Sequence, residues 1–385
     1  MTAGTGHVWL SSEKGGKRSA SATFRVMRRA ATAVKLTDLT KHYGELARRS
    51  LLQWSPPPTG AGPALGAYGL GTGTGHGQSR IDVHQHMIPP GYARWLATHH
   101  AADAGGRPLP AWRVQRALTA MEMVGTSRAI LSVSAPGTAP ASDTADAEAT
   151  ARAVNDFGAE LVKDQPDRFG FLATVPLPNL PAATREATRA LDQLHAHGLI
   201  LLANNRGTYL GETGQAELFA ELDARNAIVF VHPAALPGPP VPGIPPFAAD
   251  FLLDTTRAAY LLVRNGVTDQ YPRIRFILSH AGGFVPYAAH RIAISIANDT
   301  GRTPQEVLEQ LRSFYFDTAL SASPATLPSL LAFAKPGHIM FGSDWPFAPQ
   351  PAVQYFTSGL DAYQEADQRL HDAINHGNAA ALFPG

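Results

Sequence analysis

The sequence contains no cysteine among its 385 residues. This absence excludes disulfide bonds and thiolate metal ligands, so a transition metal would have to be held by histidine and carboxylate, a combination that suits zinc or manganese. Because cysteine usage is also the usual evidence for a redox compartment, its absence leaves the compartment open.

The chain also lacks a long hydrophobic run and a strong charge of either sign. No stretch approaches the roughly 20 apolar residues that a membrane-spanning helix needs. The formal net charge is +1, which gives no reason to expect nucleic acid or a membrane surface as a partner. Hydrophobic residues make up 44% of the chain and charged residues 16%. This composition predicts a soluble globular enzyme with a substantial core.

Residues 1–79 are poor in side chains that could join a core. They are rich in Arg, Ser, Gly and Pro, which predicts a flexible extension before a domain that spans residues 80–385. Residues 47–52 (ARRSLL) faintly resemble a twin-arginine export signal. The three prolines at 56–58 argue against the apolar region of a signal peptide. We therefore expect a cytoplasmic leader, with export as the alternative.

After residue 79, short β-branched runs alternate with longer amphipathic stretches. Eight strands that alternate with helices imply a parallel sheet, and in a chain of this length they favour a closed (β/α)8 TIM barrel over an open doubly wound sheet. The expected strands are Arg80–His86, Arg128–Val133, Phe169–Val175, Gly198–Leu202, Ile228–His232, Arg275–His280, Phe314–Asp317 and His338–Ser343. The expected helices include Trp112–Val124, Ser142–Gln165, Pro181–His197, Thr213–Arg225, Ala248–Tyr271 and Phe284–Ala297.

Four of these strand ends carry side chains that can bind a metal. Side chains alternate across a strand, so His84 and His86 project to the same face and could converge on one ion. His232, His280 and Asp344 each follow another apolar run, at the end of the strand where barrel enzymes keep their chemistry. A single histidine of this kind would more often be a buried, hydrogen-bonded residue. Together, the four strand ends predict a metal-dependent enzyme with its site at the C-terminal face of the barrel.

Two connections on the same face are longer than a barrel requires. Met87–Pro110 follows the first strand, and Pro233–Pro246 contains seven prolines, too many for regular structure. Both are candidate walls or lids of a pocket, and a solvated loop without a role is the alternative for each.

Motifs at these strand ends resemble the amidohydrolase-2 branch of the amidohydrolase superfamily. They are residues 82–90 (DVHQHMIPP), 231–233 (VHP), 279–283 (SHAGG) and 341–346 (FGSDWP), and the likeness extends to residues 377–383 (GNAAALF). Within this branch, the chain most resembles the decarboxylases related to 2-amino-3-carboxymuconate-6-semialdehyde decarboxylase, especially the 6-methylsalicylate and orsellinate type.

The resemblance implies one divalent ion, zinc first and manganese second, and it implies a ligand set and an acid/base. The implied ligands are His84, His86, His232 and Asp344, and the implied acid/base beside the ion is His280. Binuclear members of the superfamily bridge their ions with a carboxylated lysine or a glutamate from a middle strand. No lysine lies between residues 163 and 335, and neither of the expected strands Phe169–Val175 and Gly198–Leu202 contains lysine or glutamate. A mononuclear site is therefore expected.

The activity implied by the resemblance is non-oxidative decarboxylation of an ortho-hydroxybenzoate such as 6-methylsalicylate. The carboxylate and the phenolic oxygen of such a substrate can both approach one cation. Asp344, assisted by His280, is expected to deliver the proton to the ring carbon that loses CO₂. A water activated by His280 is the alternative donor.

The substrate pocket and the oligomer are also expected from the resemblance and from nearby aromatic residues. Phe284 and Trp345, with Phe347 and Trp112, could enclose an aromatic ring, although each could belong to the core instead. Arg291 matches an arginine that reaches the substrate site of a neighbouring subunit in relatives, which predicts a homodimer or larger homo-oligomer. A surface ion pair is the alternative for Arg291.

Two other functional classes remain. A mononuclear hydrolase of a lactone or amide would use the same ligands. Residues 201–211 resemble the 6-methylsalicylate group and favour the decarboxylase, although Asn205 and Arg206 depart from the pattern there. The third class, a sugar- or partner-binding barrel without activity, is disfavoured because all the ligands are intact.

Overall fold

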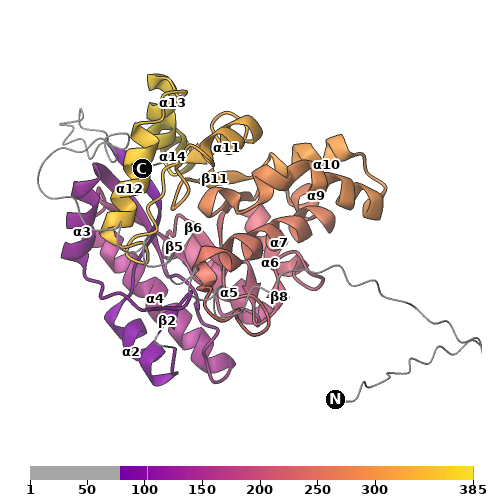
Figure 1. Ribbon diagram of the computed structural model, residues 1–385. Helices are drawn as coiled ribbons and strands as arrows, with labels where there is room; N and C mark the ends of the chain where they lie inside the picture. The colour runs from indigo at the N-terminus through magenta and orange to yellow at the C-terminus, as the bar shows by residue number, and fades with distance from the viewer. Residues whose placement is uncertain (1–78, 102, 385) are drawn as a thin grey trace, which may run out of the picture. The chain divides into compact units, whose positions relative to one another are not determined.

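A computed structural model describes residues 79–101 and 103–384, so the predicted extension over residues 1–79 lies outside the described residues except for Ser79. Eight strands form one parallel sheet in which each strand pairs with the next along the chain, and helices lie around them (Figure 1). The strands are β1 (Arg80–His86), β4 (Thr126–Ser132), β5 (Phe169–Ala173), β6 (Gly198–Leu202), β9 (Ile228–His232), β10 (Arg275–Leu278), β11 (Tyr315–Asp317) and β12 (Ile339–Met340).

The sheet closes between the segment after β12 and β1. The backbone N–H of Val83 donates to Phe341 O at 3.0 Å, and the N–H of His86 donates to Trp345 O at 2.7 Å. In the opposite direction, Asp344 N donates to His84 O at 2.7 Å. With the first and last strands joined in this way, the predicted (β/α)8 barrel is confirmed.

The helices and two short hairpins complete the described chain. No described helix is long and apolar enough to cross a membrane. The helices are α2 (Pro90–Thr98), α3 (Val114–Met123), α4 (Thr144–Asp164), α5 (Leu180–Asp192), α6 (Ala216–Ala224), α7 (Asp250–Arg264), α8 (Val267–Gln270), α9 (Val285–Thr300), α10 (Pro304–Leu311), α11 (Leu327–Phe333), α12 (Gln350–Asp361), α13 (Gln368–Asp372) and α14 (Asn378–Leu382), with single turns η2 (Pro246–Ala248), η3 (His280–Gly282) and η4 (Ala373–Gly377). The hairpins are β2 (Asp103–Ala104) with β3 (Arg107–Pro108), and β7 (Asn204–Asn205) with β8 (Thr208–Tyr209).

The differences from the predicted elements have local causes. The predicted helix Ala248–Tyr271 is divided into α7 and α8 at Gly266, whose φ of 75° is left-handed. Helix α2 lies inside Met87–Pro110, a segment in which no helix was predicted. Pro90 is the first residue of that helix, a position where the missing N–H of proline costs nothing.

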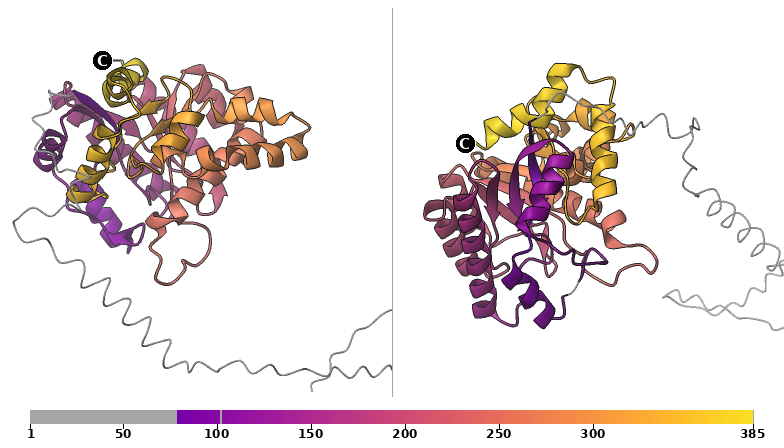
Figure 2. Two further views of the ribbon diagram at one scale, coloured as in Figure 1. Left: turned by 45° about the horizontal axis from the view of Figure 1, so that its top comes forward. Right: turned by 90° about the vertical axis from the view of Figure 1, so that its left-hand side faces the viewer.

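Apolar side chains from all eight strands meet in one cluster, which fills the barrel. Three residues of the C-terminal segment, Ala379, Leu382 and Phe383, join this cluster. Asn378 Nδ2 donates to the carbonyl of Ile339, the first residue of β12, at 2.7 Å. Both views of Figure 2 show the yellow C-terminal helix near the indigo first strand. Helix α14 therefore covers the N-terminal end of the barrel and leaves the opposite end free for a site.

Candidate metal centre and active-site cavity

Four buried side chains converge at the C-terminal end of the barrel. They are His84 and His86 of β1, His232 of β9, and Asp344 in the segment after β12, and their ligand atoms all lie within 4.8 Å of one another. The Nε2 atoms of His84 and His86 are 3.1 Å apart, and Asp344 Oδ1 lies 3.3 and 3.2 Å from them. Three imidazole nitrogens and one carboxylate suit a divalent ion. This arrangement is a divalent metal site, and it is the one such group among the described residues.

The second ring nitrogen of each histidine ligand faces an oxygen atom. The partners are Asp317 Oδ2 at 2.8 Å from His84 Nδ1, Ser132 Oγ at 3.1 Å from His86 Nδ1, and Pro233 O at 2.8 Å from His232 Nδ1. A carbonyl oxygen only accepts a hydrogen bond, so the proton of His232 lies on Nδ1 and its Nε2 is free to bind a metal. Such partners fix the tautomer and the ring orientation of a metal-binding histidine.

Asp317 is a buried residue beside the candidate site that the sequence did not single out. It is fully buried at the end of β11. Besides facing His84, its carboxylate accepts hydrogen bonds from the backbone N–H groups of His280, at 3.0 Å, and Ala319, at 2.9 Å. One carboxylate thus holds both a candidate ligand and the candidate acid/base. Its position at the end of an expected strand was the available signal, but that position does not distinguish a ligand from a supporting residue.

The electrostatics of the four side chains favour one positive charge within the cluster: a proton on His84 when no metal ion is bound, or a metal ion that displaces this proton. Burial lowers the pKa of His86 and of His232, which keeps both rings neutral. Burial also opposes charge on His84, but the negative charge of Asp317 and the hydrogen bond to it outweigh burial and raise the pKa of His84 to about 10. Burial likewise opposes charge on Asp344, yet hydrogen bonds from the surrounding histidines hold its pKa well below the usual range. Asp344 is therefore ionised, as a ligand must be.

Replacing Asp317 with asparagine is expected to lower the affinity for a divalent ion by about 10- to 100-fold, the usual effect of losing a carboxylate behind a metal-binding histidine. The amide keeps the size of the side chain but removes the charge that favours a cation at His84. Titration of zinc against a competing chelator measures the change. The control is Asp299→Asn, which alters an exposed ion pair with Arg264. Equal affinity in both variants and the parent would show that Asp317 does not support the site.

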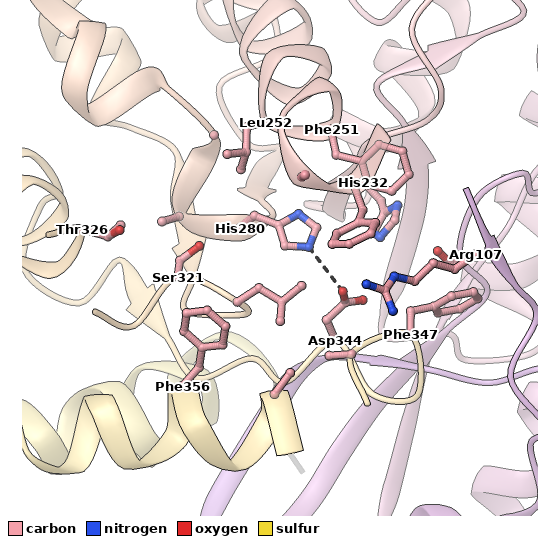
Figure 3. A pocket seen from close by; sticks show the side chains of 18 of the residues that line it. Arg107, His232, Phe251, Leu252, His280, Ser321, Thr326, Asp344, Phe347 and Phe356 are labelled. Atoms are coloured by element: carbon pink, nitrogen blue, oxygen red, sulfur yellow. Dashed lines mark ion pairs between the residues drawn. The ribbon is translucent and has the colours of Figure 1, made fainter. Parts of the chain in front are cut away.

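His280 lies beside the four candidate ligands. Its Nε2 is 3.6 Å from Asp344 Oδ2, and both side chains face the cavity (Figure 3). His280 Nδ1 is buried without a hydrogen-bond partner among the described residues. The backbone of both residues is left-handed, with φ of 54° for His280 and 60° for Asp344. Such strain in non-glycine residues is uncommon and clusters at functional sites.

The two glycines after His280 are required by packing. Both have positive φ, and a Cβ atom on Gly282 would lie 2.7 Å from the ring of Phe316. On Gly283 it would lie 2.2 Å from the carbonyl oxygen of Leu252. The turn therefore fits closely against β11 and α7, which explains these glycines without a close approach of their backbone to the ion.

A cavity of about 770 Å³ lies over the metal site. Its floor includes His232, His280 and Asp344. The walls include Arg107, Phe251, Leu252, Phe284, Leu320 and Phe347 (Figure 3). Pockets of this kind, largely apolar with a few convergent polar groups, are typical of small-molecule sites.

The first long loop forms part of the wall through hairpin β2–β3, as expected. Arg107 of that hairpin is the one lysine or arginine in the described lining, and its guanidinium stacks on Phe247 at 4.4 Å. The proline-rich loop Pro233–Pro246 does not itself line the cavity, since the lining there begins at Phe247. That expectation was therefore wrong by a few residues.

Two of the four predicted aromatic wall residues line the cavity, namely Phe284 and Phe347. Trp345 does not line the cavity, because its side chain belongs to the hydrophobic core. Trp112 is also in the core, where it packs edge-on against Phe157 at 6.0 Å. Both tryptophans therefore take the alternative that the sequence left open, a place in the core.

Arg291 and the loop at residues 201–211 also lie outside the lining. Arg291 is exposed on α9, and its guanidinium has no hydrogen bond or ion pair with a described residue, so the alternative of a surface ion pair is absent among the described residues. The loop forms hairpin β7–β8, and Arg206 binds the carbonyls of Ala139 and Ala141. Neither Asn205 nor Arg206 can therefore contact a ring in this cavity.

Comparison with known proteins agrees with this geometry. The model of the amidohydrolase family matches residues 81–385. The decarboxylase yanB of Aspergillus niger is 38% identical over 322 residues, which cover 79% of this chain and 87% of that protein. A 6-methylsalicylic acid decarboxylase of Penicillium expansum is 36% identical over 318 residues, which cover 80% and 96%. A crystal structure described as an amidohydrolase II is 32% identical with a TM-score of 0.76, covering 80% of this chain and all of that one. The chain therefore belongs to the amidohydrolase family, in its group of decarboxylases.

Proposed function

We propose that the protein is a metal-dependent, non-oxidative decarboxylase of an ortho-hydroxybenzoate, such as 6-methylsalicylate. The observation that carries the proposal is the placement of His280 and Asp344 side by side at the floor of a largely apolar cavity, next to three buried histidines. Relatives at 36% and 38% identity are decarboxylases. Arg107, the one guanidinium in the described lining, favours an anionic substrate at this site.

We further propose that one ion is held by His84, His86, His232 and Asp344, with zinc as the first choice and manganese as the second. A bound divalent cation would orient the carboxylate and phenolic oxygens of the substrate and draw electron density from its ring. Asp344 and His280, 3.6 Å apart, would then share one proton taken up from solvent and transfer it to the ring. The proton forms a new C–H bond at the ring carbon, the carbon–carboxylate bond breaks, and its electron pair restores the aromatic ring as CO₂ leaves.

Phe284 and Phe347 are proposed to contact the flat face of the substrate. Both line the cavity, and the ring of Phe347 meets the imidazole of His86 edge-on at 5.3 Å. An aromatic substrate packed against such rings gains from edge and face contacts in addition to burial.

The test is to incubate metal-analysed protein with a panel of salicylates and of lactones and amides. Release of CO₂ and opening of a lactone or amide bond are followed separately. We expect CO₂ from at least one ortho-hydroxybenzoate and none from the matching meta-hydroxybenzoate, which cannot offer both oxygens to one cation. Opening of a lactone or amide without any CO₂ would instead assign the protein to the hydrolases.

A homodimer is proposed as the active unit. Tyr287, Arg291 and Ile294 share one face of α9, and the two apolar side chains are 87% and 55% exposed. An exposed guanidinium without a described partner, between two exposed apolar side chains, suits a contact with a second copy. Sedimentation of the purified protein at several concentrations measures this association.

We also propose that residues 80–385 form the whole catalytic domain, behind a cytoplasmic leader. A chain that starts at Ser79 is expected to fold and to keep its activity, because residues 1–78 contain too little apolar sequence to join the core. Ser79 itself should be kept, since its side chain and carbonyl bind Ser127 and His376. Specific activity and the thermal midpoint of the two chains are compared. An insoluble or inactive shortened chain would contradict the division.

A further inference from the structure

The cavity is larger than the substrate class proposed above requires. A methylsalicylate has eleven non-hydrogen atoms, and if each takes the roughly 30 Å³ of a water molecule in the liquid, the molecule fills about 330 Å³. The cavity offers about 770 Å³. More than half of it would remain empty around such a substrate, and the position of this extra space indicates what else the site can bind.

The extra space extends between α11 and α12, on the side away from Arg107. In Figure 3, Thr326, Ser321 and Phe356 lie on one side of Asp344, and Arg107 and Phe347 lie on the other. We call this part of the cavity the arm, and its lining residues are Ser321, Thr326, Ser329, Leu330, Ala352 and Phe356.

The chemistry of the arm suits an uncharged apolar group. No charged side chain is among its lining residues. Leu330 of α11 is fully buried and belongs to the core, so it lies at the inner end of the arm. On α12, Ala352 lies one turn before Phe356, and its small side chain leaves the space that a larger residue would fill.

We propose that the arm binds an apolar substituent on the substrate ring that is longer than a methyl group. The substrate is then a salicylate with an extended, uncharged alkyl chain. This inference rests on the proposed decarboxylation, because the ring must sit at the metal site for its substituent to enter the arm. A second copy of the chain could cover the mouth at the exposed Tyr287, but the residues that line the arm all belong to this chain.

Alkylsalicylates test the proposal directly. Methyl, propyl and pentyl chains at ring carbon 4, 5 or 6 are compared by kcat/KM for CO₂ release. Each buried methylene should raise kcat/KM about fourfold, so for at least one ring position the pentyl compound, with four more methylenes, should exceed the methyl compound by roughly 250-fold. If the methyl compound is the best substrate at every position, the proposal is wrong while the decarboxylase assignment stands. If no compound releases CO₂, both fall.

Variants that fill the arm test whether the alkyl chain binds there. Ala352→Phe should lower the ratio of kcat/KM for the pentyl compound to that for the methyl compound at least tenfold, because the new ring occupies the chain's space. Ser329→Phe places a ring in the arm from α11, the facing helix, and is the test variant if Ala352→Phe does not fold. The control, Gln354→Phe, places an equal ring on α12 outside the described lining and should leave the ratio unchanged. An unchanged ratio in both arm variants would overturn the proposal.

Discussion

Asp344→Asn is expected to abolish decarboxylation, and His280→Ala is expected to lower kcat by about 10²–10⁴, the usual contribution of a positioned acid/base. The aspartate change has the larger effect because it removes a charged ligand and the proposed proton source together. His280→Ala should keep the ion, since His280 is not one of the four clustered ligands. Metal content and single-turnover rates of CO₂ release measure the two effects separately.

A reaction in D₂O should place one deuterium on the ring carbon that lost CO₂. The matched control is His195→Ala, an exposed histidine before β6, which should leave both rate and metal unchanged. A His280→Ala protein that keeps its metal and its full rate would exclude His280 from the proton transfer. Loss of the metal from that protein would show instead that His280 is a ligand.

His84→Ala and His232→Ala are each expected to remove the bound ion and with it the activity. The parent protein should contain about one divalent ion per chain, because its described residues contain one group of clustered ligands. Elemental analysis of the purified proteins gives the stoichiometry, and His195→Ala again serves as the control. Two ions per chain in the parent, or full metal content in both variants, would contradict the mononuclear site.

The same ion should be lost as the pH falls. Imidazole and carboxylate bind a cation only when deprotonated, so protons compete with the metal at low pH and metal binding releases protons. Occupancy, followed at fixed free zinc, is therefore expected to be complete at neutral pH and to decrease in acid. Activity should fall in parallel with metal occupancy. If adding zinc at the same pH partly restores the activity, loss of the ion causes the loss of activity. Activity that falls in acid while the metal stays bound would place the titrating group elsewhere.

The order of the elements could be predicted from the sequence because each strand is a short apolar run and each helix a longer amphipathic one. Periodicity is a local property of the chain. The ends of the elements were less certain, because tertiary contacts decide them. Strand β10 stops at Leu278, two residues before the predicted end at His280, where a turn with positive φ begins.

The side chains that could gather at the site were also predictable, because all five occur where an apolar run stops, and the family resemblance implied which four of them are ligands. The residues that orient the candidate ligands could not be predicted. Asp317 differs from a ligand only in the direction of its carboxylate, which faces His84 Nδ1 and the backbone of His280. That direction depends on how β11 packs beside β10, and no local sequence pattern predicts it.

The sequence by itself determined the barrel, the ligand types and the amidohydrolase family, since these follow from the order of residues along single strands and loops. Only the tertiary structure decided what surrounds the site. It placed Trp345 in the core and Arg107 in the cavity, and it opened the arm between α11 and α12. The physical reason is that a cavity wall is assembled from side chains of loops far apart in the chain, and their directions are fixed by packing once the barrel has closed.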